Sequence, residues 1–451
     1  MAAEANECYR QNQLCLFGSV AYRGRLRALS VPECHTDRAQ LIQNKRTTSM
    51  SSLVGIVTVA LVASLFMSFT VGANSNSAPI APAVGANALS TLRGALLVGL
   101  VAALGAVAQG GSISETIGHG LVTGVTITPL AATATLLTAA TLITIGNSRG
   151  YPIPSAFTVT GAAIGAGVAL GGGFAVGTYA EILGFWFAIP VVEGVLAYGL
   201  AWLLLDETVP DTLSIPLLAG GVGYALANVQ LSFLPAPHSE QGSIAGVLTR
   251  QLDLAATGIG EASTALVGGV IGLLTIVAVY WQLRRDVTTG INRMLVALAL
   301  VVVFTSGGSQ VGLATGPLES VFESSLGLPS LYLLGLGGLG ILLGGWFRSP
   351  RLIQAVAREY ASLGPKRSIA AFIPAFLIAQ VAIVLGYPIS FNKVMISSIV
   401  GAGLVGGSSS SDGVSAAKTG YTVGAWIASM VGGGAISFAL YHALAALPGL
   451  G

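Results

Sequence analysis

The sequence is poor in charged residues. Asp, Glu, Lys and Arg together make up 8% of its 451 residues, whereas a soluble domain carries about 25%. A chain with so little charge cannot cover a surface that faces water, so an ordinary soluble protein is excluded. The formal net charge of +2 favours no class of partner, and we expect no nucleic-acid partner.

Cysteine and histidine are scarce as well. The three cysteines, Cys8, Cys15 and Cys34, all precede residue 50 and lack C-x-x-C spacing. This pattern argues against both a disulfide framework and a zinc site. The four histidines are scattered, and no H-E-x-x-H pattern occurs. An intramembrane enzyme would need a nucleophile with a base, or a metal cluster. We therefore expect no enzymatic activity, no catalytic residue, no metal and no resident cofactor.

Apolar residues, in contrast, make up 53% of the chain, and the mean hydropathy is +0.80. A helix of about 20 mostly apolar residues crosses the roughly 30 Å of hydrocarbon in a bilayer. The sequence predicts an all-α, multi-pass protein of the cell membrane, embedded in the lipid bilayer, with about 10 to 12 spans, some of them re-entrant half-helices. The predicted spans are 51–71, 94–109, 121–145, 153–175, 183–205, 213–234, 263–283, 292–306, 328–347, 369–386, 388–407 and 421–447.

Internal repetition divides the chain into two halves. Residues 152–167 align with residues 388–403 without a gap, and residues 69–75 match residues 304–310. Transporters are commonly built from two related halves. In chain order we expect a polar, disordered N-terminal tail (1–49), a first transmembrane repeat (50–205), a linking span with a surface loop (206–262) and a second transmembrane repeat (263–451).

Basic residues indicate opposite orientations for the two repeats. Arg284 and Arg285 precede one predicted span, and a basic cluster within residues 348–367 lies two spans later, hence on the same side. The positive-inside rule makes this side cytoplasmic. The corresponding segment of the first repeat, residues 114–120, has no such cluster, as expected if it faces outward. The repeats are therefore predicted to be inverted.

Several motifs resemble those of the inorganic phosphate transporter family, whose halves each carry G-A-N-D-V-A-N-A and, later, P-V-S-T-T-H. The first motif reads G-A-N-S-N-S-A over residues 72–78, and its second copy reads G-G-S-Q-V-G-L-A over residues 307–314. The later motif reads P-I-P-S-A-F over residues 152–157 and P-I-S-F-N-K over residues 388–393. The E-T-I-G-H-G segment at residues 115–120 is also similar to a family segment.

The resemblance implies an inverted repeat with two re-entrant hairpins that binds phosphate centrally and couples to Na+ or H+. This sequence departs from the family motifs at central positions. Ser75 and Gln310 stand where each first motif has Asp, and Lys393 stands where the later motif has His. Sodium prefers oxygen ligands, so the loss of two carboxylates weakens a sodium site. We therefore expect protons rather than sodium as the coupling ion.

The candidate substrate site consists of polar residues at matched places in the two repeats. Helices that break within the membrane expose backbone N–H groups and helix N-termini, which favour an anion. Hydroxyl and amide side chains add further donors, although such residues can also merely bond neighbouring helices. The expected substrate-binding residues are Asn74, Ser75, Asn76, Ser77, Ser155, Thr158, Ser309, Gln310, Ser390, Asn392 and Lys393.

Two ionisable residues lie in apolar runs. Glu193 lies between Pro190 and Gly194, and a charge at membrane depth marks a functional candidate. We expect it to carry the coupling proton; a structural bond to a helix broken at Pro190 is the alternative. Lys393 would supply a positive charge to an oxyanion if it points inward, and would otherwise extend to the membrane interface.

These features together favour a secondary transporter that moves inorganic phosphate by ion-coupled alternating access. Other tetrahedral oxyanions can use similar donors, so a sulfate or other oxyanion permease of the same fold is the main alternative. An anion channel is a second one. The sequence is compatible with a homodimer but does not determine the oligomeric state.

Overall fold

The computed structural model describes residues 34–148, 153–234, 242–254, 262–360, 363–405 and 416–447. Two compact units divide the chain, Met1–Leu53 and Val54–Gly451. The first unit is described only over residues 34–53, which are helical and form the start of helix α2 (Cys34–Asn74). The remainder of the predicted polar tail, residues 1–33, lies outside the described residues.

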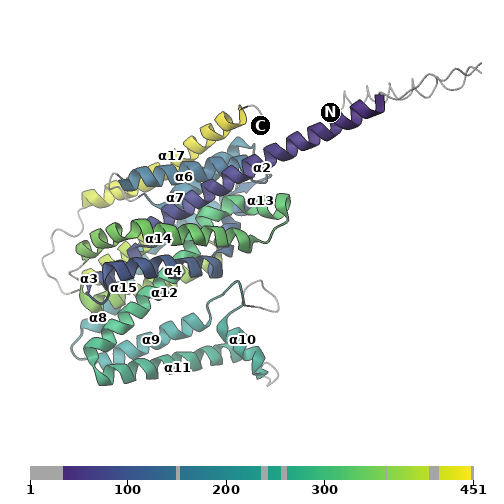
Figure 1. Cartoon of the computed structure of the whole chain (residues 1–451). Coiled ribbons are helices and arrows are strands. Elements are labelled where there is room, and N and C mark those ends of the chain that lie inside the picture. Colours follow the sequence, from purple (N-terminus) through teal and green to yellow (C-terminus); the bar gives the residue numbers. More distant parts are fainter. Residues whose placement is uncertain are drawn as a thin grey trace, which may run out of the picture. The chain divides into compact units, whose positions relative to one another are not determined.

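The second unit is almost entirely helical (Figure 1). After α2, the first predicted repeat contains η1 (Ala78–Ile80), α3 (Ala81–Gly85), α4 (Thr91–Gln109), α5 (Gly111–Glu115), η2 (Thr116–Gly120), α6 (Pro129–Ser148), α7 (Ser155–Ala169) and α8 (Val176–Leu205). Two short strands, β1 (Val122–Thr123) and β2 (Gly173–Phe174), pair antiparallel.

The linking region contains α9 (Asp211–Ala227) and, within the predicted surface loop, α10 (Ile244–Gln251). Helix α9 packs against α11 (Figure 1). The second predicted repeat contains α11 (Ala262–Arg285), α12 (Val287–Thr315), η4 (Gly316–Leu318), α13 (Glu319–Val321), η5 (Phe322–Leu326), α14 (Ser330–Tyr360), α15 (Gly364–Leu385), α16 (Phe391–Gly403) and α17 (Ala416–Ala445).

Nine helices in the described part of the chain are long and apolar enough to cross a membrane. The predicted all-α, multi-pass architecture is thereby confirmed. The other three predicted spans coincide with shorter helices: α7 has 15 residues, α9 has 17 and α16 has 13. At 1.5 Å per residue, α7 and α16 are about 20 Å long, less than the roughly 30 Å of hydrocarbon. They therefore have the length of half-helices.

Glycines allow the long helices to approach closely at matched places in the two halves. A Cβ at Gly344 in α14 would collide with the carbonyl of Phe69 in α2, and one at Gly105 in α4 would collide with the carbonyl of Phe304 in α12. Phe69 and Phe304 are matched positions in the sequence alignment of the halves. Small residues permit such contacts between helices in lipid. The recurrence supports the two-repeat organisation that we propose.

The short helices lie between elements of both proposed repeats. Helix α7 packs against α6, which precedes it, and against α17, the last helix of the other half. Correspondingly, α16 packs against α15, which precedes it, and against α8, the last helix of the first half. Each short helix is thus enclosed partly by its own half and partly by the other.

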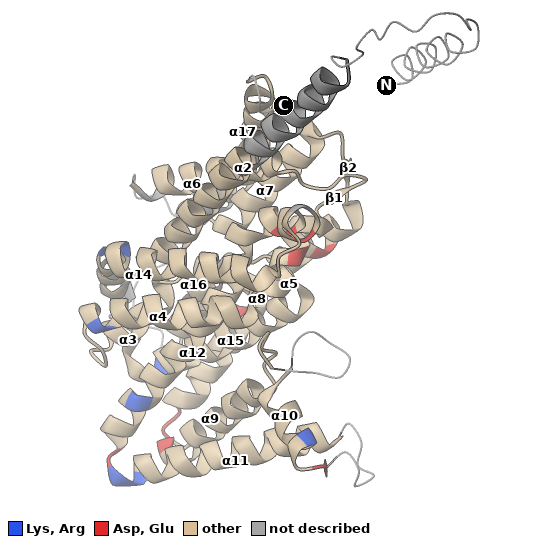
Figure 2. Cartoon of the chain, turned by 45° about the vertical axis from the view of Figure 1, so that its right-hand side comes forward, with Lys and Arg blue, Asp and Glu red and all other residues tan. Residues whose placement is uncertain are grey.

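The two ends of the helical unit differ in charge. Helices α4 and α14 are antiparallel, because Gly110 lies against Leu334 while Gly99 lies against Trp346. The segment that follows α4 is therefore at the end opposite the basic part of α14. Figure 2 shows acidic residues beside α5, whereas basic residues gather toward the other end of α14 and where α11 meets α12. This distribution supports the orientation that we propose.

Candidate functional site

The two short helices begin at a shared polar cluster. The Ser155 hydroxyl, at the start of α7, donates a 2.9 Å hydrogen bond to Oε1 of Gln310 in α12. Nε2 of Gln310 donates a 2.8 Å bond to the carbonyl of Ile389, just before α16. The first backbone N–H groups of a helix have no partner within it, and they carry partial positive charge. Two such N-termini meeting across one glutamine favour an anion.

From this cluster the short helices run toward opposite ends of the unit. Near the end of α7, Gly167 packs against Val122 of β1. Beyond the end of α16, the carbonyl of Val405 accepts a 2.9 Å bond from Arg367, at the basic end. The arrangement has the geometry of two half-helices that start at a common centre and enter from opposite sides.

Prolines explain why the helices start here. Pro154 is the N-cap of α7 and has an extended backbone conformation. Pro388 lies just ahead of the extended N-cap residue of α16, Ser390. Proline has no N–H to donate to a preceding helical turn, and the residue before it avoids the helical region. The chain therefore stays extended up to each proline-containing segment and can begin a new helix after it.

The end of α2 completes the cluster. Ser75 Oγ lies 3.3 Å from Ser155 Oγ. Asn76 Oδ1 accepts a 2.6 Å bond from Ser306 in α12, and Asn74 Oδ1 accepts a 3.4 Å bond from Asn392 in α16. The polar run after the first span thus contacts α7, α12 and α16. We call this group the central cluster; its side chains are Asn74, Ser75, Asn76, Ser155, Ser306, Ser309, Gln310 and Asn392.

Some predicted residues take other positions. The hydroxyls of Ser77 and Thr158 donate to carbonyls one turn back in the chain, those of Ala73 and Pro154. Ser390 is buried, but its side chain does not cap α16. Ser306 belongs to the cluster although it is not among the residues expected from the sequence. Its position one turn before Gln310 in the same apolar span is the signal that could have identified it.

Two amide donors in the central cluster lack partners. Nδ2 of Asn74 and Nδ2 of Asn76 are buried without a hydrogen bond among the described residues, and so is Oδ1 of Asn392. An unpaired buried polar group is costly, so a ligand with several oxygen atoms would stabilise this arrangement. The cluster has no carboxylate, because Ser75 and Gln310 occupy the places of the family's acidic residues.

Lys393 and Glu193 lie in a separate group beside α8. Lys393 Nζ donates a 2.6 Å bond to the carbonyl of Trp186, so its ammonium is directed to α8. Glu193 is fully buried in the same helix. Neither of its carboxylate oxygens has a hydrogen-bond partner among the described residues.

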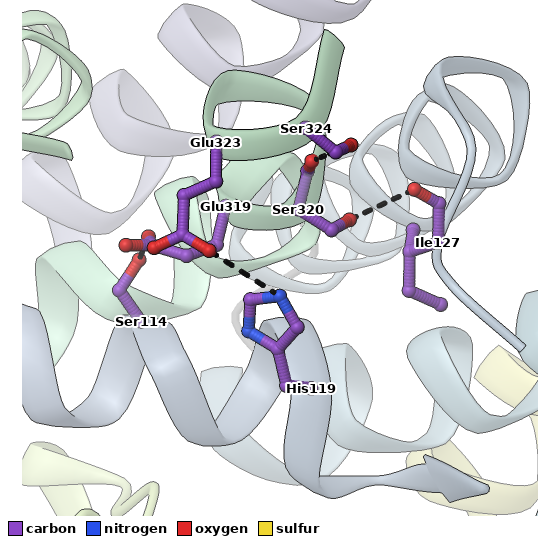
Figure 3. A network of polar contacts seen from close by, with 7 residues as sticks. All are labelled: Ser114, His119, Ile127, Glu319, Ser320, Glu323 and Ser324. Atoms are coloured by element: carbon purple, nitrogen blue, oxygen red, sulfur yellow. Dashed lines mark hydrogen bonds and ion pairs between the residues drawn. The ribbon is translucent and has the colours of Figure 1, made fainter. Parts of the chain in front are cut away.

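A further polar network joins the segments that follow α4 and α12 (Figure 3). The Ser114 hydroxyl lies 3.2 Å from Thr315 and donates to the buried carboxylate of Glu319. Nearer the surface, His119 Nε2 lies 3.8 Å from a carboxylate oxygen of Glu323. Glu319 is not among the residues expected from the sequence, although it lies five residues after the second motif copy (307–314). The network ties the two halves together at the end opposite the basic cluster.

Comparison with known proteins identifies relatives over most of the chain. The sequence profile of the phosphate transporter family matches residues 71–437. A protein of Haemophilus influenzae named "Putative phosphate permease" is 23% identical over 383 residues, which cover 78% of this chain and 88% of that protein. One of the same name from Helicobacter pylori strain J99 is 26% identical over 371 residues, covering 75% of this chain and 67% of that one.

A solved structure shares the fold. It is described as "The sodium-dependent phosphate transporter", has a TM-score of 0.73 and is 23% identical to this chain. The similarity covers 87% of this chain and 99% of the solved one. The helical arrangement described above is therefore that of a known membrane transporter fold.

Proposed function

The chain belongs to the phosphate transporter family, and on that premise we propose that it is a secondary transporter that moves inorganic phosphate across the membrane. The observation that carries the proposal is the central cluster, in which two half-helix N-termini and unpaired amide donors converge. The relatives named as phosphate permeases and the fold shared with a sodium-dependent phosphate transporter support the same substrate.

The chemistry of the cluster favours phosphate over sulfate. Both are tetrahedral anions that accept hydrogen bonds from amides, hydroxyls and helix N-termini. At neutral pH phosphate also retains a proton and can donate, whereas sulfate cannot. Oδ1 of Asn392 is a buried acceptor without a donor among the described residues, and a site with such a group discriminates against a ligand that leaves it unpaired.

Alternating access is the mode of movement that we propose. The central cluster lies between half-helices that run to opposite ends of the unit. Rocking of one half against the other would open this centre to each side in turn, as in other transporters with inverted repeats.

For coupling we propose protons, with Glu193 as the carrier. The central cluster contains no carboxylate to hold sodium, while Glu193 is a buried carboxyl in a membrane-spanning helix, the kind of residue that marks ion pathways. The protein of the solved structure is described as sodium-dependent, so both ions belong in the test.

Uptake of radiolabelled phosphate into proteoliposomes tests the function. We expect saturable accumulation above equilibrium, driven by a proton gradient, that excess unlabelled phosphate inhibits more strongly than sulfate does. Accumulation distinguishes a transporter from a channel, which only equilibrates the anion. A protein without saturable uptake of phosphate under either a proton or a sodium gradient would contradict the proposal, and preferential uptake of sulfate would reassign the substrate.

A further inference from the structure

The backbone of α8 is interrupted at one carbonyl. In a helix the carbonyl of residue 186 accepts from the N–H of residue 190, but Pro190 lies inside α8 and has no N–H. Within a membrane, an unsatisfied carbonyl is destabilising unless another donor replaces the lost one. The Lys393 ammonium, on α16, is that donor, at 2.6 Å from the oxygen of Trp186.

Aromatic rings from two further helices surround the same ammonium. Lys393 Nζ lies 4.3 Å from the ring centroid of Trp426 in α17 and 5.3 Å from that of Phe157 in α7. The Phe157 ring stacks on Trp186, with centroids 3.8 Å apart. Aromatic faces attract cations within about 6 Å of the centroid, more strongly when the cation is desolvated. The ammonium thus has a carbonyl and two aromatic faces as neighbours.

A buried carboxyl group lies in α8, where that helix contacts the helix that carries this ammonium. Glu193 follows Pro190 within one turn, is 0% exposed and has no hydrogen-bond partner for either oxygen among the described residues. Its neighbour Gly194 lies against Gly401 of α16, so Glu193 lies where α8 contacts the helix that carries Lys393. An isolated buried carboxylate is costly, and a nearby cation or a bound proton lowers that cost. Lys393 and Glu193 therefore belong to the same contact between α8 and α16.

We propose that the Trp186 carbonyl and the rings of Phe157 and Trp426 form a site for a monovalent ammonium-type cation, with the Lys393 ammonium as its built-in occupant and the Glu193 carboxyl group, when ionised, as the source of attraction for its charge. A carbonyl, a carboxylate and aromatic faces are the groups that recognise an ammonium ion. The protein supplies from its own chain a cation that this site would otherwise take from solution. The binding part of this proposal is independent of the proposed function; the transport part rests on it.

Shortening the lysine makes the proposal testable with a soluble cation. Lys393→Ala removes three methylenes and the ammonium, which together have the shape of n-propylammonium. This ion, added to the variant, should occupy the site. 1-Propanol has the same length without the charge and serves as the control ligand.

The first measurement is the thermal midpoint of purified protein in detergent. We expect Lys393→Ala to unfold at a lower temperature than the unmodified protein, and n-propylammonium, but not 1-propanol, to restore the difference. The matched control is Lys366→Ala, since Lys366 forms a 2.7 Å ion pair with Asp211 and is partly exposed. That variant should show no amine-specific recovery. Equal recovery with 1-propanol, or none with either compound, would overturn the proposal.

Removal of the Glu193 carboxylate tests whether this group contributes to cation binding. In the double variant Lys393→Ala with Glu193→Gln, the n-propylammonium concentration for half-recovery should rise by at least about tenfold, because the attraction of the carboxylate for the cation is lost. An unchanged concentration would exclude the carboxylate from the site.

Pro190→Ala tests the role of the Trp186 carbonyl, which lacks a helical donor because of Pro190. It remains informative if Lys393→Ala does not fold. This substitution restores a backbone N–H that can donate to the Trp186 carbonyl, so the ammonium is no longer needed there. Lys393→Met, which keeps most of the chain length, should therefore lower the thermal midpoint less in the Pro190→Ala background than in the unmodified one. Equal losses in both backgrounds would contradict the role of the carbonyl.

Phosphate uptake gives the functional readout. The rate for Lys393→Ala should fall by at least about tenfold, the value of a hydrogen bond to a charged group, and should recover with n-propylammonium. If the unmodified protein does not take up phosphate, the proposed function fails while the thermal measurements still decide the cation site. A variant that transports normally without the amine would overturn the transport part.

Discussion

Ser155 donates a 2.9 Å hydrogen bond to Gln310 and so joins the start of α7 to the C-terminal part of α12. The two residues belong to different proposed repeats. Gln310 also holds the carbonyl of Ile389, ahead of α16. This glutamine therefore ties the two helix N-termini to each other.

Ser155→Ala should weaken phosphate binding, because Oε1 of Gln310 loses its donor and α7 is no longer tied to α12. The loss of one buried hydrogen bond predicts a two- to tenfold increase, on the order of 1 kcal/mol, in the phosphate concentration for half-maximal uptake. Thr158→Val is the control, since the Thr158 hydroxyl bonds to the Pro154 carbonyl one turn back in the chain. Equal effects of the two variants would show that Ser155 acts through α7 alone.

Asn76→Asp should strongly weaken phosphate binding. The unpaired Nδ2 of Asn76 is a donor, and its replacement by a carboxylate puts a negative charge where the anion binds. Like charges in a buried site repel strongly, so we expect at least a roughly tenfold loss of affinity. Asn228→Asp, near the surface where Asn228 donates to the Tyr224 carbonyl, should leave the phosphate affinity unchanged. Calorimetric titration with phosphate measures both; unaltered affinity in Asn76→Asp would remove this residue from the site.

Restoring the acidic residues of the family motif should increase sodium dependence. Ser75 and Gln310 both lie beside Ser155, so Ser75→Asp and Gln310→Asp together would place two carboxylates at one position. Oxygen ligands with negative charge favour a hard cation. We expect uptake by this double variant to rise when sodium is added, more than it does for the unmodified protein. The neutral pair Ser75→Asn with Gln310→Asn is the control, and an identical sodium response in both would refute the expectation.

The orientation of the two repeats can be tested by cysteine labelling. Glu115 and Arg351 are exposed and lie at opposite ends of the paired helices α4 and α14. In a background with Cys8, Cys15 and Cys34 replaced by serine, a membrane-impermeant reagent should label Glu115→Cys from outside and Arg351→Cys from the cytoplasm. Labelling of both from one side would contradict the proposed topology.

Gly105→Ala should destabilise the protein. Its added Cβ would collide with the carbonyl of Phe304, and overpacking of a close helix contact costs about 1–3 kcal/mol. Gly335→Ala is the matched control, because no heavy atom lies within 4 Å of the position of its Cβ. Thermal unfolding in detergent should show a lower midpoint for Gly105→Ala only. A similar shift in both variants would mean that helix propensity, rather than the contact with Phe304, determines the thermal midpoint.

Much of the fold could be predicted because lipid imposes a long apolar run on each crossing helix, and the family resemblance is confirmed by the profile match. The central cluster was also foreseeable, since Ser75 and Gln310 recur at matched places. The hydrogen bond from Lys393 to the Trp186 carbonyl could not be predicted. Pro190 and its four-residue spacing to Trp186 are visible in the sequence, but the approach of α16 to α8 depends on tertiary packing. The contact between Ser114 and Glu319 likewise joins residues far apart in the chain.

Each short helix packs against a helix of the opposite half, and this packing has a consequence for biosynthesis. Helix α7 packs against α17 on one side, yet α17 is synthesised long after it, because α7 ends at Ala169 and α17 begins at Ala416. At typical rates of synthesis, α7 waits on the order of tens of seconds for its neighbour. During that time its apolar face must be covered by lipid or by the insertion machinery. The first half expressed alone should therefore be degraded, and the two halves expressed as separate chains should protect each other.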